Sequence, residues 1–301
     1  MENLLLIISK PDNIPIIILF LSVPLCTLVA FREAFKNDKA ISEGKTPVEA
    51  VLGAEVNLPE KLHVWPYLLR AEFLSAVICT ILLLVWSIAL NAPLESPANA
   101  NITPNPSKAP WYFLGLQELL VYFDPWIAGV VLPTGIVVGL MAIPYVDVNP
   151  KGNGYYTWME RKFSITVFCF GFLVMWVSLI IIGTFIRGPG WMWFWPWNHW
   201  DHTKVIAETN RDLSDLIGIA SNSPAGLVIG LGFIGAWFVA WVAVPFAVMK
   251  AKKAEILTKL GIERYLVVAL LMGSMAFVVL KVLLRLVLSV KYILVTDWFN
   301  V

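Results

Sequence analysis

The chain has 301 residues, of which 58% are hydrophobic and 14% charged, and its mean hydropathy is +0.75. Soluble domains contain roughly 45–50% apolar and 25% charged residues, so this composition favours a membrane protein. The net charge of +1 gives no reason to expect a nucleic acid or another polyanion as a partner.

Six apolar stretches are long enough to cross a bilayer as helices, which takes about 20 residues each. Because lipid offers no hydrogen-bond partners to the backbone, such stretches form helices rather than open strands. We therefore predict an all-α integral membrane protein with about six transmembrane helices. The expected spans are residues 14–31, 67–90, 126–145, 163–186, 225–249 and 265–290.

The distribution of basic residues predicts the orientation of these spans. The connections 32–66, 146–162 and 250–264 contain 13 Lys and Arg residues, whereas both termini and the connections 91–125 and 187–224 contain six. The positive-inside rule assigns the first group to the cytoplasm. We expect both termini on the outer side of a bacterial-type cytoplasmic membrane.

The connection 91–125 contains the most distinctive sequence of the chain. Its first half is rich in Pro and Asn, which predicts an extended path rather than a helix. Residues 109–113 read Ala-Pro-Trp-Tyr-Phe and open an apolar segment that runs to Leu120, with Pro110 suited to the first helical position. This segment is too short to span and predicts an amphipathic helix lying on the outer membrane surface.

The run PLESPANANITPNPSKAPWYFLGLQELL resembles the loop and surface helix of the C-terminal half of cytochrome b. This half is a separate polypeptide, subunit IV, in cytochrome bf complexes. The family has a Pro-rich approach, a P-E-W-Y motif and an aromatic-rich helix at its quinol-oxidising pocket. The flanking residues 62–67 (Leu-His-Val-Trp-Pro-Tyr) and 145–150 (Tyr-Val-Asp-Val-Asn-Pro) are also similar to it.

The resemblance covers about residues 55–186 and divides the chain into three regions. Residues 1–54 add an N-terminal span and a cytoplasmic linker to the subunit IV-like unit. Residues 187–301 add a Trp-rich outer loop and two further spans.

The resemblance implies a haem-free subunit of a cytochrome bc-type quinol oxidoreductase that is not active alone. Quinol at the subunit interface would pass electrons to a Rieske centre and to b haems, with protons released outside. The implied partners are a haem-bearing N-terminal-type cytochrome b, a Rieske 2Fe–2S protein, a cytochrome c and lipid, in a dimeric complex. The residues agree that the cofactors lie elsewhere, because none of the three histidines falls in a span and the cysteines form no C-x-x-C motif.

One departure from the family pattern changes the expected proton chemistry. Pro110 stands where the family has the glutamate of P-E-W-Y, and proline has no side chain that accepts a proton. Glu118 lies seven residues after Trp111, on the same side of a helix, and is our candidate general base, with Asp124 second. The alternative is that Glu118 faces headgroups or a partner subunit. The expected walls of the outer quinol pocket, which are otherwise interfacial anchors, are Pro110, Trp111, Tyr112 and Phe113.

Charged residues near the ends of two spans allow further hypotheses. Tyr67, Arg70 and Glu72 form a possible inner quinone site, and the alternative is a snorkelling pair at headgroup depth. Lys281 and Arg285 share one face of the last span. Snorkelling to the outer interface explains both, and the alternative is contact with a haem propionate or an anionic lipid.

The outer loop that follows the fourth span has five tryptophans within residues 191–200. Such a platform anchors a protein at the membrane interface, or docks a Rieske or cytochrome c subunit. His199 and His202 are weak candidates for metal ligands, and we predict no metal site in this chain.

Two other functions compete with quinol oxidation. A non-catalytic membrane anchor of a respiratory complex accounts for Pro110 without a further assumption. A secondary transporter predicts broken helices in matched halves with ionisable residues near the bilayer centre, and this sequence shows neither.

Overall fold

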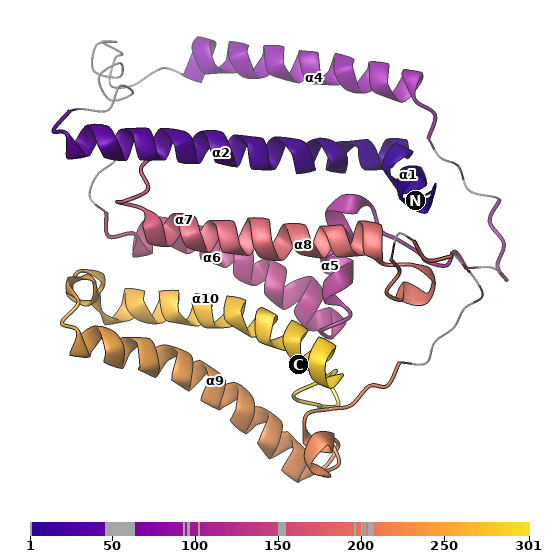
Figure 1. The fold of residues 1–301 in the computed structure, drawn as a ribbon, viewed down its shortest axis with the longest axis vertical. Helices are drawn as coiled ribbons and strands as arrows, with labels where there is room; N and C mark the ends of the chain where they lie inside the picture. Colours follow the sequence, from indigo (N-terminus) through magenta and orange to yellow (C-terminus); the bar gives the residue numbers. More distant parts are fainter. Residues whose placement is uncertain are drawn as a thin grey trace.

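A computed structural model describes residues 2–45, 64–92, 94, 97–101, 103–149, 155–195, 197–199, 201, 203 and 208–301. Six of its helical stretches are long and apolar enough to cross a membrane, which confirms the predicted fold class. They lie roughly parallel or antiparallel in a flat arrangement, with α4 at one edge and α9 at the other (Figure 1).

Each span consists of one or more consecutive helical segments. A short helix α1 (Glu2–Ser9) and the turn η1 (Pro11–Asn13) precede α2 (Ile14–Ser42). The second and third spans are η2 (Val64–Leu68) with α4 (Leu69–Ala89), and η3 (Ile127–Val131) with α6 (Leu132–Val146). The other spans are α7 (Lys162–Cys169) with η4 (Phe170–Trp176), α8 (Val177–Ile181) and η5 (Ile182–Ile186), then α9 (Pro224–Ala251) and α10 (Glu255–Leu288).

Two helices extend well beyond the predicted apolar stretches. Helix α2 continues to Ser42 instead of ending at Phe31, because its last turns pack on the connection before α7. There Asp38 accepts backbone hydrogen bonds from Trp158 and Met159 at 3.2 and 3.1 Å. Helix α10 begins ten residues earlier than expected, with a break at Gly261, where φ is +73°. Both extensions are polar, so a hydropathy pattern does not detect them.

The ends of the helices separate the connections into two groups. The three basic connections lie at one end, and both chain termini lie at the other end together with the short helix α5 (Trp111–Leu119) (Figure 1). Basic and less basic connections therefore alternate between the two ends of the helices, as the charge pattern predicted.

The core lies at the end of the molecule that carries α5. A cluster of buried residues there joins the end of α5 to α8, α10 and the C-terminal segment. The members of this cluster are Leu119, Tyr122, Phe123, Ala128, Leu179, Phe277, Val278 and Ile293. Helix α4, by contrast, buries none of its residues. The end that carries α5 is therefore where the chain packs on itself.

Candidate functional site

Helix α5 is the short surface helix that the sequence predicted. It begins at Trp111, and Pro110 is the extended residue before it rather than its first helical residue. The Pro110 carbonyl accepts the first hydrogen bond, from the Phe113 amide at 2.8 Å. The fixed φ of proline suits this position as well as the one predicted.

The two faces of α5 differ in what they contact. Its inner face buries Leu114, Gly115, Glu118 and Leu119. Tyr112 and Phe113 are 53% and 52% exposed, and Trp111 is half-buried. The ring centroids of Trp111 and Tyr112 lie 5.6 Å apart, and those of Tyr112 and Phe113 lie 4.9 Å apart. These three neighbouring rings are here called the aromatic patch.

Two glycines allow α5 to sit directly on the end of the fourth span. A Cβ on Gly183 would lie 3.2 Å from the Leu114 carbonyl oxygen, and one on Gly115 would lie 3.4 Å from Ile180 and Trp176. Contacts of this kind leave little room for larger residues. The close fit determines how α5 presents the aromatic patch.

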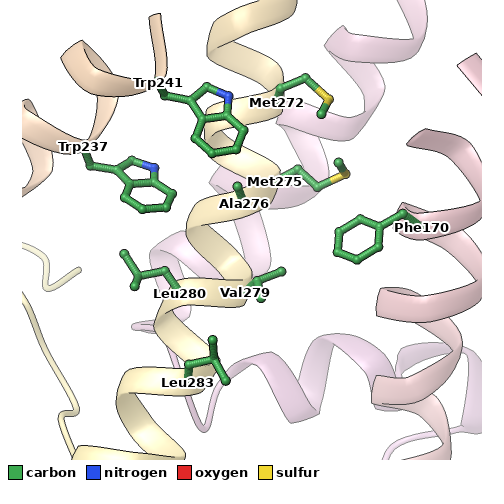
Figure 2. Close-up of a pocket in the computed structure, with 9 residues that line it drawn as sticks. All are labelled: Phe170, Trp237, Trp241, Met272, Met275, Ala276, Val279, Leu280 and Leu283. Atoms are coloured by element: carbon green, nitrogen blue, oxygen red, sulfur yellow. The ribbon is translucent and has the colours of Figure 1, made fainter. Parts of the chain in front are cut away.

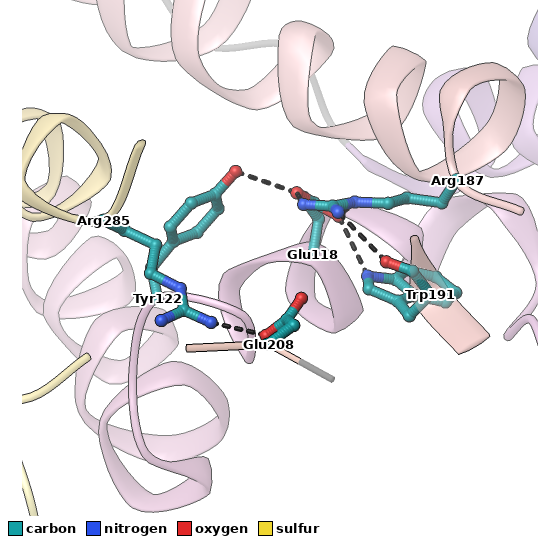
Figure 3. A network of polar contacts seen from close by, with 6 residues as sticks. All are labelled: Glu118, Tyr122, Arg187, Trp191, Glu208 and Arg285. Carbon is teal, nitrogen blue, oxygen red and sulfur yellow. Dashed lines mark hydrogen bonds and ion pairs between the residues drawn. The ribbon is translucent and has the colours of Figure 1, made fainter. Parts of the chain in front are cut away.

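The Glu118 side chain, on the buried face of α5, is at the centre of a buried polar network (Figure 3). Arg187 donates to both carboxylate oxygens, from Nη2 to Oε1 at 2.7 Å and from Nε to Oε2 at 2.9 Å. The Tyr122 hydroxyl donates to Oε1 at 2.9 Å, and Trp191 Nε1 donates to Oε2 at 3.1 Å. Arg187 Nη1 also donates to the Trp191 carbonyl at 3.0 Å. This two-pronged ion pair is among the stronger kinds of polar contact.

The electrostatics of the network favour its charged form. Burial and the Glu118 carboxylate raise the pKa of Tyr122 above its usual range, so this hydroxyl stays a donor. Burial lowers the pKa of Arg187, but its hydrogen bonds to Glu118 outweigh burial and raise it. Tyr122 and Arg187 therefore keep the protons that they donate to the Glu118 carboxylate.

The candidate Asp124 belongs to a different set of contacts. Its Oδ1 accepts from the Trp126 amide at 3.1 Å, and its carbonyl accepts from the Ala128 amide at 2.9 Å. Asn300 Nδ2 lies 3.5 Å from Oδ2. Asp124 thus begins the third span and is not brought together with Glu118.

The possible inner-site residues lie at the opposite end of the helices from α5 (Figure 1). Tyr67, Arg70 and Glu72 are exposed, and no ion pair or hydrogen bond joins any of these side chains to another part of the described chain. An inner quinone site at these residues stays a prediction that needs a partner to enclose it.

Of the two histidines that the sequence offers as candidate metal ligands, His202 lies outside the described residues and His199 is exposed. Among the residues that the structure describes, no cluster of three or more His, Cys, Asp or Glu side chains is placed to hold a metal ion.

An apolar hollow of about 370 Å³ opens between η4, α9 and α10 (Figure 2). No ionisable side chain lines it. The hollow therefore has no charged group to fix a ligand, and we do not place a quinol ring there. Its lining residues are Phe170, Trp237, Trp241, Met272, Met275, Ala276, Val279, Leu280 and Leu283.

The explanation of Lys281 by snorkelling is wrong. Its side chain is fully buried, and its ammonium donates to the Lys291 carbonyl at 2.5 Å and lies over the rings of Phe123 and Tyr292. The C-terminal segment covers this residue, and a helical periodicity carries no information about that fold-back. Arg285 pairs with Glu208 at 2.5 Å (Figure 3).

The Trp-rich loop contacts the site through Arg187. The guanidinium lies 5.4 Å from the ring centroid of Trp193, which packs on Trp195. Trp195 and Trp197 are stacked, with centroids 5.3 Å apart and an interplanar angle of 1°. The predicted platform therefore starts at the buried ion pair and ends at exposed indole rings.

Sequence reasoning missed two residues of this site. Arg187 is the first residue after the fourth span. In the sequence it is only one of the basic residues of the connection 187–224, and nothing there identifies it as a partner of Glu118. Lys108 is the single basic residue of the connection 91–125, which was a signal available in the sequence. Lys108 Nζ donates to the Thr184 carbonyl at 2.9 Å, at the end of the fourth span.

Six spans and a surface helix seated on a buried ion pair define a multi-pass membrane protein. Residues 97–195 match the family model described as cytochrome b (C-terminal)/b6/petD, which confirms the resemblance found in the loop. The matched segment, 99 of the 301 residues, is thus similar to the C-terminal part of cytochrome b. The match begins after α4 and includes α5, Arg187 and part of the Trp-rich loop. No solved structure matches the chain.

Proposed function

We propose that the aromatic patch of α5 forms one wall of an outer quinol-oxidising site that a haem-bearing cytochrome b completes. The observation that carries this proposal is the contrast between the two faces of α5. Its inner face is locked by Glu118 and the two glycines, while Tyr112 and Phe113 remain exposed. Exposed aromatic rings on a rigid support suit a flat quinol ring, and they leave the enclosure of the pocket to a partner.

The reaction would be the two-electron oxidation of a quinol with release of its protons on the side of α5. The spans contain no histidine, so a b haem does not fit this chain, and we assign the haems and the Rieske 2Fe–2S cluster to partner subunits. This assignment also includes a cytochrome c, a dimeric complex and a bacterial-type cytoplasmic membrane with both termini outside. The role of this chain is to bind and orient the quinol.

Glu118 remains a candidate proton acceptor, with Asp124 second. Arg187 donates hydrogen bonds to both carboxylate oxygens of Glu118. For Glu118 to accept a proton from quinol, these hydrogen bonds must first break. The inner site at Tyr67, Arg70 and Glu72 is likewise part of the proposal.

The aromatic patch is tested by Tyr112→Ala and Phe113→Ala in the assembled complex. We expect each substitution to lower kcat/KM for quinol about tenfold, which corresponds to roughly 1.4 kcal/mol of lost binding. Tyr145→Ala is the matched control, because this ring is also exposed but lies on α6 at the opposite end of the helices. Unchanged quinol oxidation in variants of Trp111, Tyr112 and Phe113 would contradict the proposal and favour a membrane anchor.

A further inference from the structure

The extended connection that leads into α5 is attached to the end of the fourth span. Residues 105–109, here called the strap, lie just before α5. The Asn105 side-chain oxygen accepts a hydrogen bond from the Gly190 amide at 2.5 Å, and the Lys108 ammonium donates one to the Thr184 carbonyl at 2.9 Å. These two contacts hold the strap against η5 and the loop after it, and neither of them involves α5.

Gln117 is the residue of α5 that holds the strap from the other side. Its side-chain oxygen accepts a hydrogen bond from the Ala109 amide at 2.8 Å, and its side-chain nitrogen donates one to the Ser107 carbonyl at 2.8 Å. These two backbone groups belong to the chain neighbours of Lys108. The contact needs a donor and an acceptor on one side chain, which an amide provides and a carboxylate or an ammonium does not.

The position of Gln117 determines which part of α5 the strap covers. Helical side chains point back toward the preceding turn, and residues three or four apart share a face. Gln117 therefore reaches toward Leu114, which is buried, and Phe113, which is 52% exposed. The strap thus follows the border between the buried face of α5 and the aromatic patch.

The first turn of α5, which carries the aromatic patch, has no cap of its own. Pro110 makes no side-chain hydrogen bond to the helix, and the first turn contains no acidic residue. Uncapped first turns leave backbone amides without partners, and a helix of nine residues is marginal by itself. The Gln117 contact fixes Ala109, the residue directly before Pro110, and in this way fixes the point at which the helix begins.

We infer that Gln117 is a positioning residue of the proposed quinol site, which clamps the strap and thereby holds the aromatic patch in the orientation that receives the quinol ring. This inference rests on the proposed function and names the residue that preorganises its binding wall. Gln117 contacts the strap rather than the quinol. Its loss should therefore weaken quinol binding and leave the chemical step unchanged, because preorganisation acts on binding.

Gln117→Met removes both hydrogen bonds while keeping the length and the helix propensity of the side chain. In the assembled complex we expect KM for quinol to rise about fivefold, with kcat per haem changed by less than about twofold. A residue that served assembly alone would instead lower the yield of haem-containing complex and leave KM unchanged. Ser107→Ala is the matched control and should keep the wild-type KM, because Gln117 contacts only the Ser107 carbonyl.

Gln117→Glu separates the two hydrogen bonds of the clamp. An ionised glutamate still accepts from the Ala109 amide but cannot donate to the Ser107 carbonyl. Hydrogen exchange in the assembled complex should show the Ala109 amide protected in the wild type and in Gln117→Glu. In Gln117→Met the same amide should exchange about tenfold faster or more. We expect the KM of Gln117→Glu to lie between those of the wild type and Gln117→Met.

Two results overturn the inference, and they are distinguishable from a failure of the proposed function. One is a wild-type KM in Gln117→Met, and the other is an Ala109 amide that exchanges as fast in the wild type as in Gln117→Met. If Tyr112→Ala and Phe113→Ala still lower kcat/KM, only the role of Gln117 is lost. If all of these variants oxidise quinol as the wild type does, the proposed function fails as well.

The test also covers a variant that does not assemble. Where Gln117→Met yields no complex, as judged by co-purifying haem, the KM of Gln117→Glu decides. A raised KM supports the clamp, and an unchanged KM overturns it.

Discussion

Helices α4 and α5 are joined by one loop, yet they differ in how much of their surface the rest of the chain buries. Helix α4 has 21 residues, spans the membrane by its length and composition, and buries no side chain. Helix α5 has nine residues, spans nothing, and buries four of them. A helix as short as α5 is not stable by itself in water, so its contacts must hold it. A span such as α4 needs no packing to remain helical in lipid.

This difference indicates which surfaces of the chain are complete. Where α5 meets the fourth span, buried polar groups find partners, and close glycine contacts fix the geometry. Along most of α4, after Arg70 and Glu72 in its first turn, the exposed side chains are mainly apolar, and lipid or a neighbouring subunit would cover them equally well. The α5 region is therefore fixed within the chain itself, whereas the surface of α4 is left to lipid or to an assembly partner.

The largest expected effect comes from breaking the buried ion pair. Arg187→Ala leaves the Glu118 carboxylate buried without its cation and should lower the free energy of unfolding by about 3–5 kcal/mol. A denaturant titration of the detergent-solubilised chain measures this change. The double variant Glu118→Leu with Arg187→Leu should cost less than either single variant, because it leaves no buried charge. Additive losses in the double variant would show that the two side chains act independently.

A smaller effect is expected where α5 touches the fourth span through glycine. In Gly183→Ala the new methyl group meets the Leu114 carbonyl and should destabilise the chain by about 1–2 kcal/mol. Gly135→Ala on α6 is the matched control, since no atom lies within 4 Å of the position of its Cβ. There we expect no loss, or a gain of up to about 1 kcal/mol from helix propensity. Equal losses of unfolding free energy at both glycines would contradict the close packing of α5 against the fourth span.

The smallest effect on the isolated chain is expected on α4. Leu83 is 69% exposed, so Leu83→Ala should change the free energy of unfolding by less than about 0.5 kcal/mol. In the complex, the same substitution combined with Leu82→Ala should reduce the haem-bearing subunit that co-purifies with the chain. Leu119→Ala, in the core below α5, gives the opposite pattern of a clear loss in the isolated chain. Full recovery of the haem subunit with α4 variants would assign that surface to lipid alone.

The sequence by itself determined the parts of this protein that depend on local composition. Six apolar stretches of sufficient length, a short aromatic segment bounded by Pro110 and Asp124, and the alternation of basic connections were all visible before any contact was known. The residues of the loop also indicated the cytochrome b family. These features could be predicted because a bilayer selects helices by length and hydropathy alone.

Only the tertiary structure decided which way the polar side chains of the site point. The helical pattern of α5 places Glu118 on one face of that helix. Its partner Arg187 lies 69 residues later in the sequence, and helical periodicity cannot predict a pairing over that separation. Lys281 turned out to be covered by the C-terminal segment, and Lys108 to be fixed by Gln117 against the fourth span. Such pairings depend on how the spans pack against one another. In these apolar surroundings a hydrogen bond is stronger than in water, so a few of them fix the geometry of the site.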